Sequence, residues 1–206
     1  MSVQPAHPDN AITGNEQRVN TAAHGALPLE LLRELRTDHA GETGAVMIYR
    51  GVLAVARDAQ VRAFAQHHLQ TELRHLALIN EVVPPRWRSR LLPLWRVSGW
   101  VTGALPACFG ARAVYATIES VETFVDHHYA AQVRWIDDVL AAEPQHPQRA
   151  RLLHLRALLE QCRLDEVAHR DDAAARFSGQ ARGLLALWRA LVGRGSAQAV
   201  RLCRYI

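Results

Sequence analysis

The motif Glu-x-x-His occurs twice in this chain, once at Glu72–His75 and once at Glu166–His169. Each copy lies in a long segment whose apolar residues recur with the period of an α-helix. At this spacing the carboxylate and the imidazole project from one face of the helix. Such a pair is either a surface pair or half of a metal site. The rest of the fold decides between the two.

Apolar periodicity predicts four long helices joined by two short turns and one longer connection. No stretch alternates like a strand. The chain is therefore expected to form an all-α, ferritin-like four-helix bundle with an amphipathic crossover segment and an extra C-terminal helix. The alternative, which the helix pattern taken alone favours, is a simpler all-α bundle without a cofactor. The expected helices run from Leu29 to about Arg57, from an N-cap at Asp58 to about Val83, from Ala111 to about Ala142, from about Gln148 to Phe177 and from Leu184 to about Leu202.

Two further glutamates, Glu42 and Glu122, lie on the inner faces of the first and third predicted helices. Buried carboxylates are costly unless they are paired or bind a metal. In each hairpin the lone glutamate precedes the turn by about as many residues as the Glu-x-x-His motif follows it. Because every helical residue adds the same rise, the ligand-type side chains come level. This levelling favours a metal site over two surface pairs.

Four glutamates and two histidines, distributed in this way over four helices, are typical of a carboxylate-bridged dinuclear site. Four carboxylates offset the charge of two divalent cations, and oxygen-rich ligands with one imidazole per metal suit iron or manganese. Glu119, one turn before Glu122, is the alternative ligand on the third helix. The predicted metal ligands are Glu42, Glu72, His75, Glu122, Glu166 and His169.

Several other polar residues have less specific interpretations. Asp38 and Asp165 either orient ligand histidines or are charges on a helix face. The His67–His68 and His127–His128 pairs lack a partner at metal spacing. The remaining candidates are expected to be packing or surface residues: Tyr49, Tyr115 and Tyr129 in the core, and His24, His39 and His154 in packing or on the surface.

Composition agrees with one globular domain. The chain has 206 residues, of which 49% are hydrophobic and 21% charged, and all basic residues are arginines that give a net charge of +4. Residues 1–27 have no apolar core segment, so we expect a flexible N-terminal tail rather than a signal peptide, followed by one domain at residues 28–206. The scattered cysteines Cys108, Cys162 and Cys203 indicate a reducing compartment.

Five segments of the chain, taken together, resemble one known family, the demethoxyubiquinone hydroxylases, which are di-iron monooxygenases of ubiquinone biosynthesis. The resemblance covers about residues 30–205. It is carried by RTDHAGETGAVMIYRG (Arg36 to Gly51), TELRHL, LPLWRVSGWVTGAL (Leu92 to Leu105), VETFVDHHYAAQV and LDEVAHRDDA.

The resemblance implies that two iron ions are bound by the six residues named above, with Glu72 and Glu166 as bridges and Glu42 and Glu122 as terminal ligands. The HHY sequence after Glu122 favours that residue over Glu119. Thr123 stands where the family often has a second carboxylate. The implied reaction is hydroxylation of a polyprenylated methoxy-methyl-benzoquinol by O2 on its one unsubstituted ring carbon, and other ubiquinone-biosynthesis proteins are possible partners.

Residues 86–110 interleave arginine, tryptophan and leucine, a pattern typical of a helix at a membrane surface. The longest uncharged run, Val97 to Ala111, is too short to span a bilayer. We therefore expect a membrane-facing crossover and a peripheral protein on the cytoplasmic face of the cell membrane. The alternative is an ordinary crossover packed on the bundle.

Two other functions share parts of this pattern. A ferritin-like iron-storage or ferroxidase protein would use the same ligands but needs a hollow shell. A ferritin-like tRNA-modifying hydroxylase would use the basic charge, and its RNA binding would fall steeply with salt. We expect no nucleic-acid partner. A helical scaffold without enzymatic activity would bind no metal.

Overall fold

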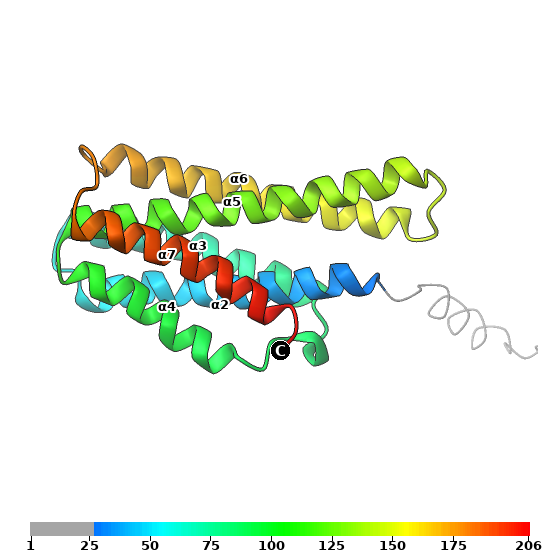
Figure 1. The fold of residues 1–206 in the computed structure, drawn as a ribbon, viewed down its shortest axis with the longest axis horizontal. Coiled ribbons are helices and arrows are strands. Elements are labelled where there is room, and N and C mark those ends of the chain that lie inside the picture. Colours follow the sequence, from blue (N-terminus) through cyan, green and yellow to red (C-terminus); the bar gives the residue numbers. More distant parts are fainter. Residues whose placement is uncertain (1–26) are drawn as a thin grey trace, which may run out of the picture.

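The computed structural model describes residues 27–206, and within them the chain forms six α-helices, one short 3-10 helix and no strand (Figure 1). The expected all-α bundle with a crossover and an extra C-terminal helix is confirmed. Two helical hairpins, a crossover and a final helix follow one another: α2 (Leu29–Val55) with α3 (Ala59–Val82), then η1 (Pro85–Trp87) and α4 (Leu92–Ala107), then α5 (Ala111–Ala142) with α6 (Arg149–Arg176), and α7 (Leu184–Cys203).

Residues 1–26 of the predicted N-terminal tail, including His24, lie outside the described residues. The last residue of that tail, Leu27, is buried in the core.

Local signals account for the second helix of the first hairpin. The side chain of Asp58 accepts hydrogen bonds from the backbone N–H groups of Gln60 and Val61, at 2.8 and 3.0 Å, and so caps α3. The helix ends just before Pro84, because proline lacks a backbone N–H and disfavours the helical conformation of the preceding residue.

Apolar side chains form two separate core clusters, one toward each end of the bundle. On α2 the first cluster includes Leu35 and the second begins at Ile48, and on α6 the first includes Cys162 and the second includes Ala173. The Glu166–His169 motif lies between the two limits on α6. On α3 the Glu72–His75 motif lies between Ala65 of the second cluster and Ile79 of the first. The two clusters stabilise the bundle on both sides of a buried polar layer, which is costly by itself.

Glycines let α4 approach the backbone of α2 very closely. A Cβ atom built on Gly103 would overlap the carbonyl oxygen of Ile48, and one on Gly99 would overlap that of Gly44. From the other side, a Cβ on Gly51 would overlap the carbonyl oxygen of Trp100. The crossover is therefore docked on α2 by direct backbone contact, as small residues permit at a helix crossing.

Helices α4 and α7 cover one side of the bundle, with α4 packed on α2 and α7 packed mainly on α5 (Figure 1). Within residues 27–206, no helix combines the length and the apolar character that crossing a membrane requires.

Candidate metal centre

The six predicted ligand residues meet in the buried layer between the two apolar clusters. Each of the four bundle helices contributes, and none of the six residues exposes more than 3% of its surface. The helical rise explains this meeting, since residues equally far from a hairpin turn stand at the same height. The contributors are Glu42 from α2, Glu72 and His75 from α3, Glu122 from α5, and Glu166 and His169 from α6.

The six residues fall into two overlapping groups, each with ligand atoms within 4.8 Å of one another. Both groups contain Glu72 and Glu166. The first group adds one glutamate and one histidine, and the second adds the other glutamate and histidine. The added residues are Glu42 with His75 in the first group and Glu122 with His169 in the second.

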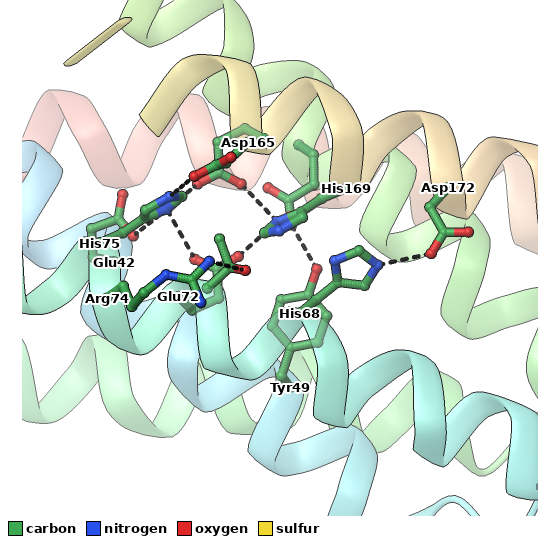
Figure 2. A network of polar contacts seen from close by, with 12 residues as sticks. Glu42, Tyr49, His68, Glu72, Arg74, His75, Asp165, His169 and Asp172 are labelled. Carbon is green, nitrogen blue, oxygen red and sulfur yellow. Dashed lines mark hydrogen bonds and ion pairs between the residues drawn. The ribbon is translucent and has the colours of Figure 1, made fainter. Parts of the chain in front are cut away.

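The two histidines face the shared carboxylates through Nδ1 (Figure 2). Nδ1 of His75 lies 2.9 Å from Oε1 of Glu166 and 3.7 Å from Oε2 of Glu42. Nδ1 of His169 lies 3.1 Å from Oε2 of Glu166 and 2.9 Å from Oε1 of Glu72. Each imidazole therefore directs one nitrogen toward the space between the carboxylates.

The electrostatics of this layer show how strongly the carboxylates attract positive charge. Burial raises the pKa of Glu42 and Glu122 well above the usual value, and the charge of Glu166 raises it further. Burial also acts to raise the pKa of Glu166, but hydrogen bonds from His169 and His75 lower it to about 2. Burial lowers the pKa of the histidines, whereas the hydrogen bond to Glu166 and the nearby carboxylate charges raise it to about 10 at His75 and about 11 at His169. A divalent cation can replace the protons held here.

Unpartnered oxygen atoms support this fit to metal ions. Oε2 of Glu42 and both carboxylate oxygens of Glu72 accept no hydrogen bond from the described residues. Oε1 of Glu72 lies 2.9 Å from Nδ1 of His169, but the two groups are not aligned for a hydrogen bond. Buried carboxylate oxygens without donors are unfavourable unless a cation binds them. The buried glutamates and histidines could therefore hold metal ions, and the oxygen-rich donor set suits iron or manganese.

Two tyrosines make contacts that the sequence pattern did not reveal. The hydroxyl of Tyr49 on α2 donates to Glu122 on α5 at 3.2 Å, and the hydroxyl of Tyr129 on α5 donates to Glu42 on α2. Both side chains are buried, as expected for core residues, but they also hold the two outer glutamates. Each tyrosine follows the glutamate of its own helix by about two turns. This spacing places each tyrosine on the same helix face as a glutamate and could have been read from the sequence. It does not show that each tyrosine binds the glutamate of the other helix.

Asp165 contacts one of the two candidate ligand histidines, and Asp38 contacts neither of them. Oδ2 of Asp165 lies 3.0 Å from Nε2 of His75, on the side away from the carboxylates, so it can orient that ring. Asp38 contacts neither ligand histidine. Its Oδ1 accepts from Nε2 of Gln132 at 2.7 Å and lies 3.1 Å from Nε2 of His128.

His68 is buried beside the centre, with its ring centroid 4.3 Å from that of His169 and Nε2 2.9 Å from Oδ2 of Asp172 (Figure 2). Burial and the charge of His169 lower the pKa of His68 to about 4. It packs against a candidate ligand, His169, and belongs to neither candidate metal-ligand group. His39 is buried, and its Nε2 lies 3.1 Å from Oδ1 of Asn80. His154 is exposed on the surface.

Glu119 lies outside the cluster. Its Oε1 pairs with the guanidinium of Arg189 on α7 at 2.9 Å, and the side chain is partly exposed, whereas Glu122 is fully buried. The ion pair turns Glu119 toward α7. This placement favours Glu122 as the ligand from α5.

A cavity of about 400 Å³ lies between α2, α4, α5 and α7 and reaches the cluster. Glu42, Glu122 and Glu166 form part of its wall. Most other lining residues are apolar or small, including Ala45, Ile48, Val121, Val125, Leu191 and Ala199. An apolar cavity that ends at a candidate metal site is suited to a hydrophobic small molecule.

Fold and site together define a ferritin-like four-helix bundle with a buried carboxylate–histidine centre of the dinuclear type. The chain belongs to the ubiquinone biosynthesis protein COQ7 family, whose model matches residues 30–203. This match confirms the resemblance seen in the sequence.

Curated relatives carry names that agree with the family. A 3-demethoxyubiquinol 3-hydroxylase of Rhodospirillum rubrum is 39% identical over 155 residues, which cover 72% of this chain and 66% of that protein. The human mitochondrial NADPH-dependent 3-demethoxyubiquinone 3-hydroxylase is 34% identical, with 68% and 61% covered. The mitochondrial 5-demethoxyubiquinone hydroxylase of Saccharomyces cerevisiae is 31% identical, with 68% and 64% covered. This chain matches between 61% and 66% of the length of these three curated relatives.

Proposed function

We propose that this protein is a di-iron monooxygenase that hydroxylates a polyprenylated methoxy-methyl-benzoquinol, a demethoxyubiquinol, with O2 in ubiquinone biosynthesis. One observation carries the proposal: two overlapping glutamate–histidine groups share Glu72 and Glu166, and Glu42, Glu122 and Glu166 of these groups lie in the wall of an apolar cavity. Family membership and the names of the relatives support the same reaction. The iron pair supplies the activation of O2, which no side chain can provide.

The protein residues have distinct roles in this proposal. Glu72 and Glu166 are common to both groups and would be the ligands shared between the two iron ions. Glu42 and Glu122 would be terminal ligands, and His75 and His169 would each bind one iron. Tyr49 and Tyr129 hold the terminal carboxylates by hydrogen bonds across the bundle. The surrounding apolar residues exclude water and place the quinol ring beside Glu42, Glu122 and Glu166.

Anaerobically purified protein loaded with iron tests this function directly. With a short-chain demethoxyubiquinol analogue and 18O2, we expect the hydroxyquinol product to carry one labelled oxygen. Label from water, or no product from the reduced iron-loaded protein, would refute the proposal. Formation of a mineral iron core would instead indicate iron storage, and tight RNA binding lost steeply with salt would indicate a tRNA-modifying enzyme.

We also propose that the protein lies peripherally on the cytoplasmic face of the cell membrane. Exposed apolar side chains line one face of α4 and one face of α7. Those on α4 are Leu94, Val97, Val101 and Leu105, and those on α7 are Leu184, Leu187 and Leu191.

The cavity adjoins these apolar stripes. Leu191 lines it and still exposes 60% of its surface, so the cavity reaches the surface between α4 and α7. A polyprenyl tail could remain in lipid while its ring enters here. Exposed arginines flank the stripes and would attract anionic headgroups: Arg86, Arg90, Arg96, Arg194 and Arg201.

Binding to anionic liposomes tests the membrane proposal. We expect co-sedimentation at low salt and partial release by high salt, since the arginine contribution is screened. Val97→Ser with Trp100→Ser should weaken binding severalfold, because these residues expose 63% and 40% of their surfaces. Trp95 is left unchanged because it lines the cavity.

The matched control is Leu153→Ser with Leu164→Ser on α6, which Figure 1 shows on the opposite side of the bundle from α4. This control should bind liposomes as the unmodified protein does. The α4 variant should also lose more turnover on a long-tailed than on a short-tailed substrate. Indifference of the unmodified protein to liposomes at low salt would exclude the membrane role.

A further inference from the structure

Asp38 is a buried carboxylate in the cavity wall that the candidate metal centre does not use. It lies on α2, one helical turn before Glu42, which is about 6 Å along the helix axis. Its side chain is fully buried, and it lines the same cavity as Glu42. One aromatic ring can span the distance between these two carboxylates.

The two oxygens of Asp38 have different surroundings. Oδ1 accepts from Nε2 of Gln132 at 2.7 Å and is 3.1 Å from Nε2 of His128. Oδ2 is buried and accepts no hydrogen bond from any residue in the described part of the chain. A buried carboxylate oxygen without a donor is unfavourable, so this atom is suited to a donor that a ligand brings.

Neighbouring groups fix the direction of this carboxylate. The hydroxyl of Thr37 donates its proton to the carbonyl of Glu34 at 2.7 Å, so toward His128 it can only accept. Thr37 and an ionised Asp38 can both only accept from Nε2 of His128, so this nitrogen carries a proton. The 3.1 Å approach of Nε2 of Gln132 to the same nitrogen is then a contact between two donors and no hydrogen bond. With Gln132 as second donor, Oδ1 is fully used, and Oδ2 alone remains available.

We propose that Oδ2 of Asp38 accepts a hydrogen bond from one ring hydroxyl of the quinol substrate, and thereby selects the reduced quinol over the quinone. The inference rests on the function proposed above. Burial raises the pKa of Asp38, while the hydrogen bonds from His128 and Gln132 oppose that rise. In its ionised form the carboxylate only accepts hydrogen bonds, whereas a quinone has carbonyl oxygens and no hydroxyl to donate. The contact also orients the ring, with its opposite edge toward the metal-ligand glutamates. His128 and Gln132 are positioning residues that act through Asp38.

Binding measurements on the full chain test this inference apart from turnover. Zinc-loaded protein exchanges no electrons with either ligand, so calorimetry without O2 can compare a short-chain quinol with its quinone. We expect the unmodified protein to bind the quinol at least about tenfold more tightly, as for a hydrogen bond to a charged group. Asp38→Asn should bring the ratio near one, because the amide oxygen stays with the two donors while its NH2 group can donate to the oxygen of either the quinol or the quinone.

Two controls separate this role from a structural one. Glu119→Gln makes the same carboxylate-to-amide change outside the cavity, where Arg189 pairs with it, and should keep the preference for quinol. The unmodified protein should bind the quinol dimethyl ether no more tightly than the quinone, since methylation removes the donors. This second comparison holds even if Asp38→Asn does not fold.

An unchanged ratio in Asp38→Asn, or equal affinity for the quinol and its dimethyl ether, would overturn the role of Asp38. If the iron-loaded unmodified protein still hydroxylates the analogue with oxygen from 18O2, only this inference fails. If hydroxylation is absent but the preference for quinol is present and lost in Asp38→Asn, the proposed reaction fails while the quinol-binding role of Asp38 is upheld. If the unmodified protein binds neither ligand, the inference is overturned as well.

Discussion

Replacing Glu72 or Glu166 with alanine is expected to remove both metal ions and to reduce hydroxylase activity to background. Both residues belong to both ligand groups, so in the proposed di-iron site each substitution would remove a ligand from two metal ions at once. Changes to residues that merely support metal ligands cost about 10–100-fold in affinity, so loss of a shared ligand should cost more than about a hundredfold. Metal content per chain after dialysis, together with turnover of the short-chain quinol, measures the effect.

The two glutamates of α5 provide the matched control. Glu122→Ala should lose metal, since Glu122 belongs to a ligand group, whereas Glu119→Ala should retain it, since Glu119 is paired with Arg189. The opposite result would exchange the two assignments. Two bound irons and full turnover in Glu72→Ala or Glu166→Ala would contradict the site as a whole.

Gly103→Ala is expected to destabilise the protein, although alanine is normally the better helix former. The added Cβ would overlap the backbone carbonyl of Ile48, which cannot move without shifting α2. Overpacking of this kind costs about 1–3 kcal/mol in the free energy of unfolding. For a chain of this size, each kcal/mol lowers Tm by roughly 2–4 °C. Thermal unfolding followed by circular dichroism measures the change.

Gly193 on α7 is the control for this substitution, because a Cβ there would meet no atom within 4 Å. Gly193→Ala should raise stability by up to about 1 kcal/mol, as expected from helix propensity alone. The same sign for both alanine variants would show that α4 does not depend on close backbone contact with α2.

Sequence signals fixed most of the helices, because those signals are local. Asp58 supplies a cap within three residues of its own position, and the proline pair at Pro84 removes a backbone donor wherever the rest of the chain lies. Helical periodicity then gave the inner face of each helix. With equal rise per residue, this is enough to bring Glu42 level with Glu72 and Glu122 level with Glu166.

Contacts between helices distant in sequence were decided only by the tertiary structure. Periodicity identifies the inner face of a helix, but not its rotation against a particular neighbour or the partner of each side chain. The bonds from Tyr49 to Glu122 and from Gln132 to Asp38 depend on such pairings.

The position of α4 has the same origin. Its glycines were visible in the sequence, but only the folded chain shows that Gly103 lies against the backbone of Ile48. That contact brings α4 to one side of a cavity bounded by α7, which follows much later in the chain. The sequence therefore determined the helices and the candidate ligand set. Tertiary packing determined the cavity and the residues that hold the ligands, because both are made of surfaces that meet only after the chain has folded.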